Sequence, residues 1–131
     1  MLGPSKNAFE LARNYRKLAT KVDDYVEQKF DKLSSSELVE LLELSDNLFR
    51  VAGTAALIGA RLDLAEMADA ATQIKSATAR LEAAIDKLDD VRKVIAAVTA
   101  SINLAGAIAS GRPDVILGAL KNLRGPIDAL T

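Results

Sequence analysis

The sequence lacks several residue types on which enzymes and metal sites depend. Its 131 residues include no His, no Cys and no Trp. Without Cys the chain can form no disulfide, no thiolate nucleophile and no zinc or iron–sulfur site with sulfur ligands. Without His it has no Ser-His-Asp triad, no imidazole metal site and no side chain whose ordinary pKa lies near neutrality. These absences exclude much of the common catalytic chemistry.

Motifs that mark other enzymes are missing as well. The chain has no G-x-S-x-G nucleophile turn and no glycine-rich loop of the kind that binds phosphates. Asp63, Glu66 and Asp69 step by three residues along one side of an expected helix, but no Asp-x-Asp-x-Asp-Gly loop accompanies them. Acidic residues are favoured near helix N-termini in any case. We therefore expect no enzymatic activity, no cofactor and no metal.

Proline and aromatic residues are scarce, and this predicts the fold class. Proline occurs only at positions 4, 113 and 126, and aromatic residues make up 4% of the chain. The long proline-free stretch is rich in Ala, Leu, Lys, Glu and Arg, which lose little entropy in a helix. No segment alternates apolar and polar residues between turn signals, as a strand would. The sequence predicts an all-α fold with a core of Leu, Ile, Val and Ala.

Two capping boxes divide the first half of the chain. In such a box a Ser, Thr or Asp and an acidic residue three positions later bind each other's backbone amides. Ser34 and Glu37 form one box, and Asp63 and Glu66 form a second. We expect helices over 5–33 and 35–60, and a third that starts near 64.

Breaks in the second half are marked by other signals. Asp89-Asp90 indicates a kink or short turn, although one unbroken helix over 64–110 is the alternative. Gly111 suits a left-handed helix end, and Pro113 suits the first residue of the next helix. Gly125-Pro126 is a stop signal, so we expect a last helix over 113–124.

Apolar residues spaced three and four apart form a stripe on each expected helix. The stripe residues are Leu11, Tyr15, Leu18, Val22 and Tyr25, widened by Ala8, Ala12, Ala19, Val26, Phe30 and Leu33; Leu38, Leu41, Leu42, Leu48, Phe49, Ala52 and Ala56; Ala71, Ile74, Thr78, Leu81, Ile85 and Leu88; and Val115, Ile116, Leu117, Leu120 and Leu123. The expected architecture is one domain over 1–131, a bundle of four or five helices with a hydrophobic C-terminal helical hairpin. Residues 126–131 are expected to form a tail. Gly3-Pro4 has the form of a protease-cleavage remnant, so residues 1–4 are left out.

Charge is nearly balanced in sum but uneven along the chain. The formal net charge is −1, which argues against a dedicated nucleic-acid binder, since such domains carry a basic excess. Residues 1–21 nevertheless have a net charge of +4, and residues 22–48 have a net charge of −6. The basic side chains Arg13, Arg16, Lys17 and Lys21 fall on one side of the first helix, away from its apolar stripe. The acidic side chains at the start of the second helix are Glu37, Glu40, Glu43 and Asp46.

These two charged surfaces are the candidate interaction site. A basic helix face can bind phospholipid headgroups, RNA or an acidic partner. The alternative is a solvated face whose counter-charges are the acidic residues of the second helix. Antiparallel packing would bring those residues closer to the C-terminal end of the first helix, so this pairing is imperfect.

Two stretches, 51–60 and 94–111, carry no charge. Small residues recur every fourth position in the second of them, at Ala97, Ser101, Ala105 and Ala109. Such a ridge permits close helix contact in a membrane or in a soluble core, and Gly53 to Ala60 offers a complementary surface. The preferred interpretation is the charge-free end of one bundle; the alternatives are membrane insertion of the 94–124 hairpin, with Ile116 and Leu120 on its second arm, and an oligomer interface.

The function expected from these patterns is non-catalytic. The first hypothesis is protein–protein interaction, as an adaptor, an inhibitor or immunity protein, or an assembly subunit, with an unknown partner or by self-association. The alternative is a membrane-active protein, either a pore-forming effector or a peripheral membrane module, that uses the 94–124 hairpin. No charged segment followed by an apolar run marks a secretory signal at the N-terminus, which favours the cytoplasm.

Overall fold

The computed structural model of the chain describes residues 6–87 and 90–128, except the side chains of residues 56–58, 66, 126 and 128. The described residues form five α-helices and no strand, which confirms the predicted all-α bundle. The helices are α1 (Lys6–Lys29), α2 (Ser35–Gly59), α3 (Ala68–Ala84), α4 (Val91–Ser110) and α5 (Pro113–Asp128). Short 3₁₀ turns are found at Phe30–Lys32, Ala60–Asp63, Ala65–Met67 and Ile85–Lys87.

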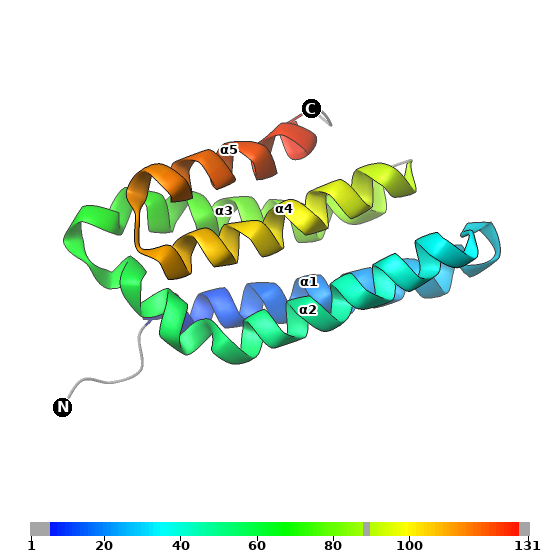
Figure 1. Cartoon of the computed structure of the whole chain (residues 1–131), viewed down its shortest axis with the longest axis horizontal. Helices are drawn as coiled ribbons and strands as arrows, with labels where there is room; N and C mark the ends of the chain where they lie inside the picture. Colours follow the sequence, from blue (N-terminus) through cyan, green and yellow to red (C-terminus); the bar gives the residue numbers. More distant parts are fainter. Residues whose placement is uncertain (1–5, 88–89, 129–131) are drawn as a thin grey trace.

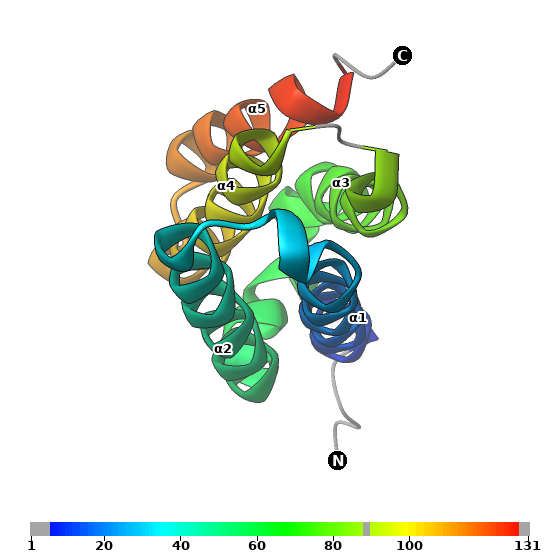
Figure 2. The same ribbon diagram turned by 90° about the vertical axis from the view of Figure 1, so that its right-hand side faces the viewer.

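The helices run alternately in opposite directions (Figure 1) and close into a ring when viewed end-on (Figure 2). Packing contacts follow the order α1, α2, α4, α5, α3 and back to α1. In the end-on view of Figure 2, the α1–α2 hairpin forms one side of this ring and α5 lies on the opposite side, against both α3 and α4. The outward surfaces of α1 and α2 are therefore left uncovered by other helices.

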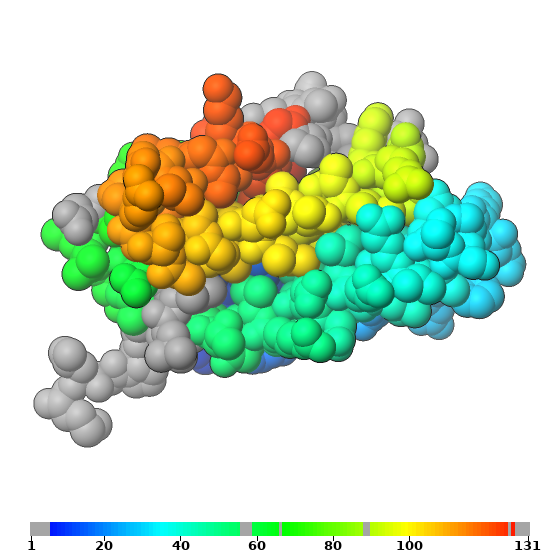
Figure 3. All heavy atoms as spheres, viewed as in Figure 1, coloured from blue at the N-terminus to red at the C-terminus, as the bar shows by residue number. Residues whose placement is uncertain are grey.

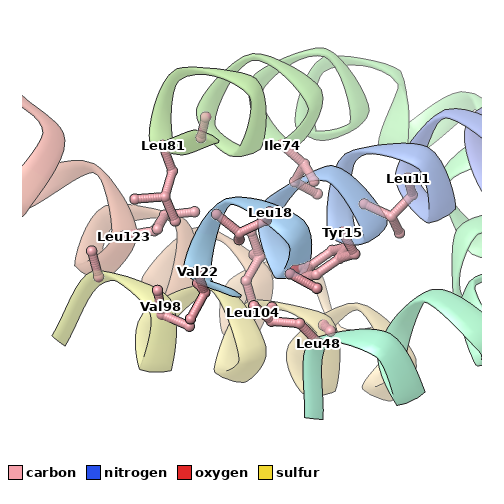
Figure 4. Packing of buried hydrophobic residues seen from close by; sticks show 14 of the residues in the cluster. Leu11, Tyr15, Leu18, Val22, Leu48, Ile74, Leu81, Val98, Leu104 and Leu123 are labelled. Carbon is pink, nitrogen blue, oxygen red and sulfur yellow. The ribbon is translucent and has the colours of Figure 1, made fainter. Parts of the chain in front are cut away.

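Buried side chains from all five helices meet inside the ring (Figure 4). The core is aliphatic, as predicted, and its members include Leu11, Leu18, Leu48, Ile74, Leu81, Leu104 and Leu123. Both tyrosines are buried, whereas the three phenylalanines, Phe9, Phe30 and Phe49, are exposed. The small side chains of the core allow the helices to approach one another closely.

Three buried or half-buried polar contacts fix how α1 sits against its neighbours. The Tyr15 hydroxyl donates to the carbonyl oxygen of Ser101 in α4, and Asn14 Nδ2 donates to Thr78 Oγ1 in α3 at 2.9 Å. Ser45 Oγ in α2 donates to Asp23 Oδ1 at 2.6 Å. Because a polar group in the core must keep its partner, each contact favours one register of α1 against the facing helix.

The predicted capping signals at Ser34 and at Gly111–Pro113 are confirmed. The Ser34 amide donates to Glu37 Oε1 at 2.9 Å, and the Glu37 amide donates to Ser34 Oγ at 3.2 Å, so both halves of the box are present. Gly111 has a φ of 71°, in the left-handed region, and Pro113 is the first residue of α5. Local side-chain chemistry thus sets these boundaries.

The second expected box, at Asp63 and Glu66, does not start α3. The α-helix begins at Ala68, after two 3₁₀ turns that are separated by an extended Leu64, and its N-terminus has no side-chain cap. Asp63 instead accepts a hydrogen bond from Asn7 Nδ2 at 2.7 Å. This contact links the start of α1 to the connection between α2 and α3, and Asp63 does not cap α3. The side chain of Glu66, the other half of the expected box, lies outside the described residues.

The two remaining boundary predictions have different outcomes. Helix α3 ends at Ala84, and a separate helix α4 begins after Asp90, whose carboxylate accepts from the Arg92 amide, so the continuous alternative is wrong. Helix α5 does not stop at Arg124 but continues to Asp128, so part of the expected tail is helical. Ile127 is buried in the core, which holds this last turn in place.

Several predicted stripe residues lie at the surface instead of in the core. The exposed members are Phe30, Leu42, Phe49, Val115 and Leu117. Leu42 and Phe49 each follow a fully buried leucine, Leu41 and Leu48, and a step of one residue turns a side chain about 100° around the helix axis. Leu41 and Leu48 are therefore buried in the core, and Leu42 and Phe49 lie at the surface. The predicted stripe residues Leu88 and Ala56 cannot be placed, because Leu88 and the Ala56 side chain lie outside the described residues.

The charge-free stretches both reach the same end of the bundle, where α2 and α4 finish (Figure 1). Gly59, in the small-residue stretch of α2, lies against α1. A Cβ added to Gly59 would lie 2.4 Å from Ala8 Cα, so Gly59 permits close approach of α1. In addition, Gly53 and Thr54 are exposed, so the 51–60 stretch is not buried on all sides.

Candidate functional site

The predicted basic residues lie together on the outward side of α1. Arg13, Arg16 and Lys17 are exposed, and they line an open hollow of about 380 Å³ with Thr20, Lys21, Asp24 and Glu82. Lys21 is only half exposed, because its Nζ pairs with Asp86 at 2.7 Å. The hydrogen bond to Asp86 raises the pKa of Lys21 above its ordinary value. The free part of the predicted basic face is thus the first three residues.

The acidic residues of α2 do not neutralise this basic face. Glu40 lies 3.8 Å from Arg92 of α4, and Glu37 is held by the cap at Ser34. Glu43 is exposed, and Asp46 pairs with Arg50 of its own helix at 3.2 Å. The expectation that α2 supplies the counter-charges of the basic face is therefore not met by any ion pair between described residues.

The ion pairs of α1 are made to the opposite neighbour, α3 and the turn that follows it. Glu10, near the start of α1, pairs with Lys75 of α3 at 2.9 Å. Lys21, about three turns later in α1, pairs with Asp86 in the turn that follows α3. The hydrogen bond from Lys75 is the main cause that lowers the pKa of Glu10. These pairs use the side of α1 that faces α3 and leave its outward side free.

Sequence reasoning missed the acidic half of the same outward surface. Asp23, Asp24 and Glu27 are exposed in the second half of α1, on the side that carries Arg13 and Arg16 in the first half. The change from positive to negative net charge near residue 22 was visible in the sequence. That the basic and acidic side chains lie on the same face of α1 was not predicted. Asp24 and Glu27 lie in no ion pair with another described residue.

Exposed apolar side chains complete the surface. Leu42 is 48% exposed and Phe49 is 43% exposed on α2, and Val39 and Phe9 are more exposed still. Leu42, Phe49 and Val39 share the outward side of α2 because their spacings of three and seven residues return to one face. We call this surface, with its charges on α1 and its apolar side chains on α2, the hairpin face.

The candidate membrane segment is mostly buried. Ala97, Ser101 and Ala105 of α4 and Ile116 and Leu120 of α5 face the core, whereas Ala109 is exposed. Among the described residues, α4 is one helix whose length and composition suit a membrane span, and half of its apolar window is buried. In Figure 3, α4 is packed between α2 and α5 along its length. The core helix of a soluble bundle has the same properties.

A second surface feature lies between α3 and α5. Two hollows, of about 250 and 520 Å³, share Gln73 and Arg124 and include Arg80 and Lys121 in their lining. Across the described residues, no three acidic side chains are grouped so that they could hold a metal ion.

Comparison with models of protein families, with curated proteins and with solved structures finds no match for the chain.

Proposed function

We propose that this chain acts through protein–protein interaction, as an adaptor, an inhibitor or an assembly subunit, and that the hairpin face is its contact surface. The observation that carries the proposal is the exposure of Leu42 and Phe49 beside free charges of both signs. Exposed aromatic and aliphatic side chains rimmed by polar residues are typical of binding surfaces.

The charges of the hairpin face define the chemistry of the partner. The partner would place acidic groups against Arg13 and Arg16, basic groups against Asp24 and Glu27, and apolar side chains against Leu42 and Phe49. Charge complementarity of this kind mainly fixes orientation and speeds association, whereas the apolar contacts supply most of the affinity. Binding should therefore weaken with salt without being abolished by it.

The membrane-active alternative rests on α4 and α5. Insertion would require this hairpin to leave the ring, because Leu104, Ile108 and Leu123 point into the core and not toward the surface. The exposed side of α4 carries Ala96, Thr99, Asn103 and Gly106, which are weakly apolar or polar and offer little free energy of insertion. The hairpin face therefore has the stronger support.

Photo-crosslinking in the native cells tests the proposal. A photoreactive phenylalanine analogue is placed at Phe49 and, in a matched control, at Asn122, which is exposed on α5. We expect a discrete protein adduct from position 49, identified by mass spectrometry, and none from position 122. The R13E/R16E variant should lose the adduct at position 49.

Two results would contradict the proposal. One is the absence of any adduct from position 49 while the chain is folded and abundant. The other is an adduct that persists unchanged in R13E/R16E and is matched by the control at Asn122, which would indicate contact without a specific surface.

A further inference from the structure

The charges on the outward side of α1 are arranged symmetrically with opposite signs about Thr20. Arg13 and Glu27 are each seven residues from Thr20, and Arg16 and Asp24 are each four residues from it. Lys17 and Asp23 are each three residues away. At about 1.5 Å per residue, the outer pair lies roughly 10 Å on either side of Thr20 along the helix. A second α1 laid antiparallel across Thr20 would therefore bring a charge of opposite sign to the level of each of these positions. Arg13 and Glu27, about 40° apart around the helix, would face each other directly, whereas Lys17 and Asp23, about 120° apart, lie on opposite flanks of α1.

The exposed apolar residues of α2 are centred at the same level. The contact of Gly59 with Ala8 and that of Ser45 with Ala19 set the antiparallel register of the hairpin. In this register Asp46 lies beside Thr20. Leu42 and Phe49 lie four residues before and three residues after Asp46, so they flank this level as the charges of α1 do.

We propose that the hairpin face binds a second copy of this chain, in a two-fold symmetric dimer in which α1 packs antiparallel on α1 and α2 antiparallel on α2. The two-fold axis lies in the interface, perpendicular to the helices, at the level of Thr20 and Asp46. This proposal rests on the proposed function and names the partner of the same surface. It satisfies the requirement of a symmetric dimer that one patch be complementary to itself.

The pattern of contacts follows from that axis. Arg13 of one copy faces Glu27 of the other, Arg16 faces Asp24, and each pair occurs twice. On α2, Leu42 faces Phe49, and Glu43 faces Arg50. Asp46 lies on the axis, where its charge is offset by Arg50 at 3.2 Å. A parallel dimer would instead place like charges together, so the charges select the antiparallel arrangement.

The arrangement permits a test by complementary charge reversal. In R13E/R16E each copy would present acidic groups to the acidic half of its partner, and in D24R/E27R each would present basic groups to the basic half. Each variant alone should be repelled. In a mixture of the two variants, however, all four kinds of facing pair are again opposite in sign. All four substituted residues are exposed and none forms an ion pair with another described residue, so both variants should fold.

Sedimentation equilibrium of the purified full chain measures the outcome. We expect the wild type to dimerise, each variant alone to associate about tenfold or more weakly, and the equimolar mixture to regain association close to that of the wild type. F49D should also weaken association, because it places a charge in the apolar part of the interface. The matched control K87E/K121E, with two exposed charges reversed away from the hairpin face, should associate like the wild type. Circular dichroism and thermal melting confirm that each variant is folded.

The results that overturn self-pairing are distinct from those that overturn the proposed function. A wild type that stays monomeric at the highest soluble concentration, or a mixture that stays monomeric as its components do, refutes this dimer. If the crosslink at position 49 then joins a different protein, the proposed function holds and the partner is not a second copy. If neither dimer nor crosslink is found, both proposals fail.

Discussion

Tyr15 is the bulkiest side chain that the described core buries completely. Its hydroxyl crosses the inside of the ring from α1 to the carbonyl oxygen of Ser101 in α4. Burial raises the pKa of Tyr15 well above its ordinary value near 10. In the unfolded chain this hydroxyl would ionise near that ordinary value, so its titration differs between the folded and unfolded states.

The variant Tyr15→Phe should lower the free energy of unfolding by about 1 kcal/mol at neutral pH, since the Ser101 carbonyl keeps its helical partner and only one hydrogen bond is lost. The folded pKa is raised, so the contribution of Tyr15 is present below pH 10 and declines as pH rises above it. Urea unfolding at several pH values measures both effects. A difference between wild type and variant that grows above pH 10 would contradict this account.

Gly59 lies against the backbone of α1 at Ala8. Gly59→Ala should reduce stability by roughly 1–3 kcal/mol, because the new Cβ would meet the backbone of α1 at Ala8 and one helix must shift. Gly53→Ala is the matched control, since a Cβ there meets nothing within 4 Å. It should raise stability by about 0.5–1 kcal/mol through helix propensity. Denaturant unfolding of both variants would show opposite signs.

Among the elements, the turn between α1 and α2 depends on one capping box. Ser34→Ala should cost about 1 kcal/mol of stability, because the Glu37 amide loses its acceptor at 3.2 Å. Ser35→Ala is the control, since Ser35 is the first residue of α2 and its hydroxyl forms none of the cap bonds. Thermal unfolding compares the two, and equal losses of stability would refute the capping role.

The sequence predicted element boundaries well where local chemistry sets them. Ser34 and Gly111 act through their own backbone neighbours, and such signals can be recognised without the fold. Asp63 has the same local pattern, but Asn7, distant in sequence, takes its carboxylate. Leu42 and Phe49 fit the apolar stripe as well as Leu41 and Leu48 do, and only the position of the neighbouring helices decides which pair is buried. The hairpin face therefore could not be found from periodicity alone.

The ring of helices buries the apolar side of α4 and α5. We therefore expect the chain to show no salt-resistant flotation with anionic liposomes. Flotation that is lost at high salt would indicate contact of Arg13, Arg16 and Lys17 with headgroups, and R13E/R16E should then abolish it. Flotation that resists high salt would favour the membrane-active alternative instead.

The order of helices in the ring has a consequence for how the chain folds. Helices α1 and α2 meet through a short turn, whereas Tyr15 reaches its partner 86 residues further along the chain. During synthesis the first hairpin leaves the ribosome early, and its apolar inner side has no cover until α3, α4 and α5 have followed. Loop closure over such a span also slows folding compared with a bundle of sequential neighbours. We therefore expect the nascent first hairpin, with its apolar inner side uncovered, to be the aggregation-prone stage of synthesis.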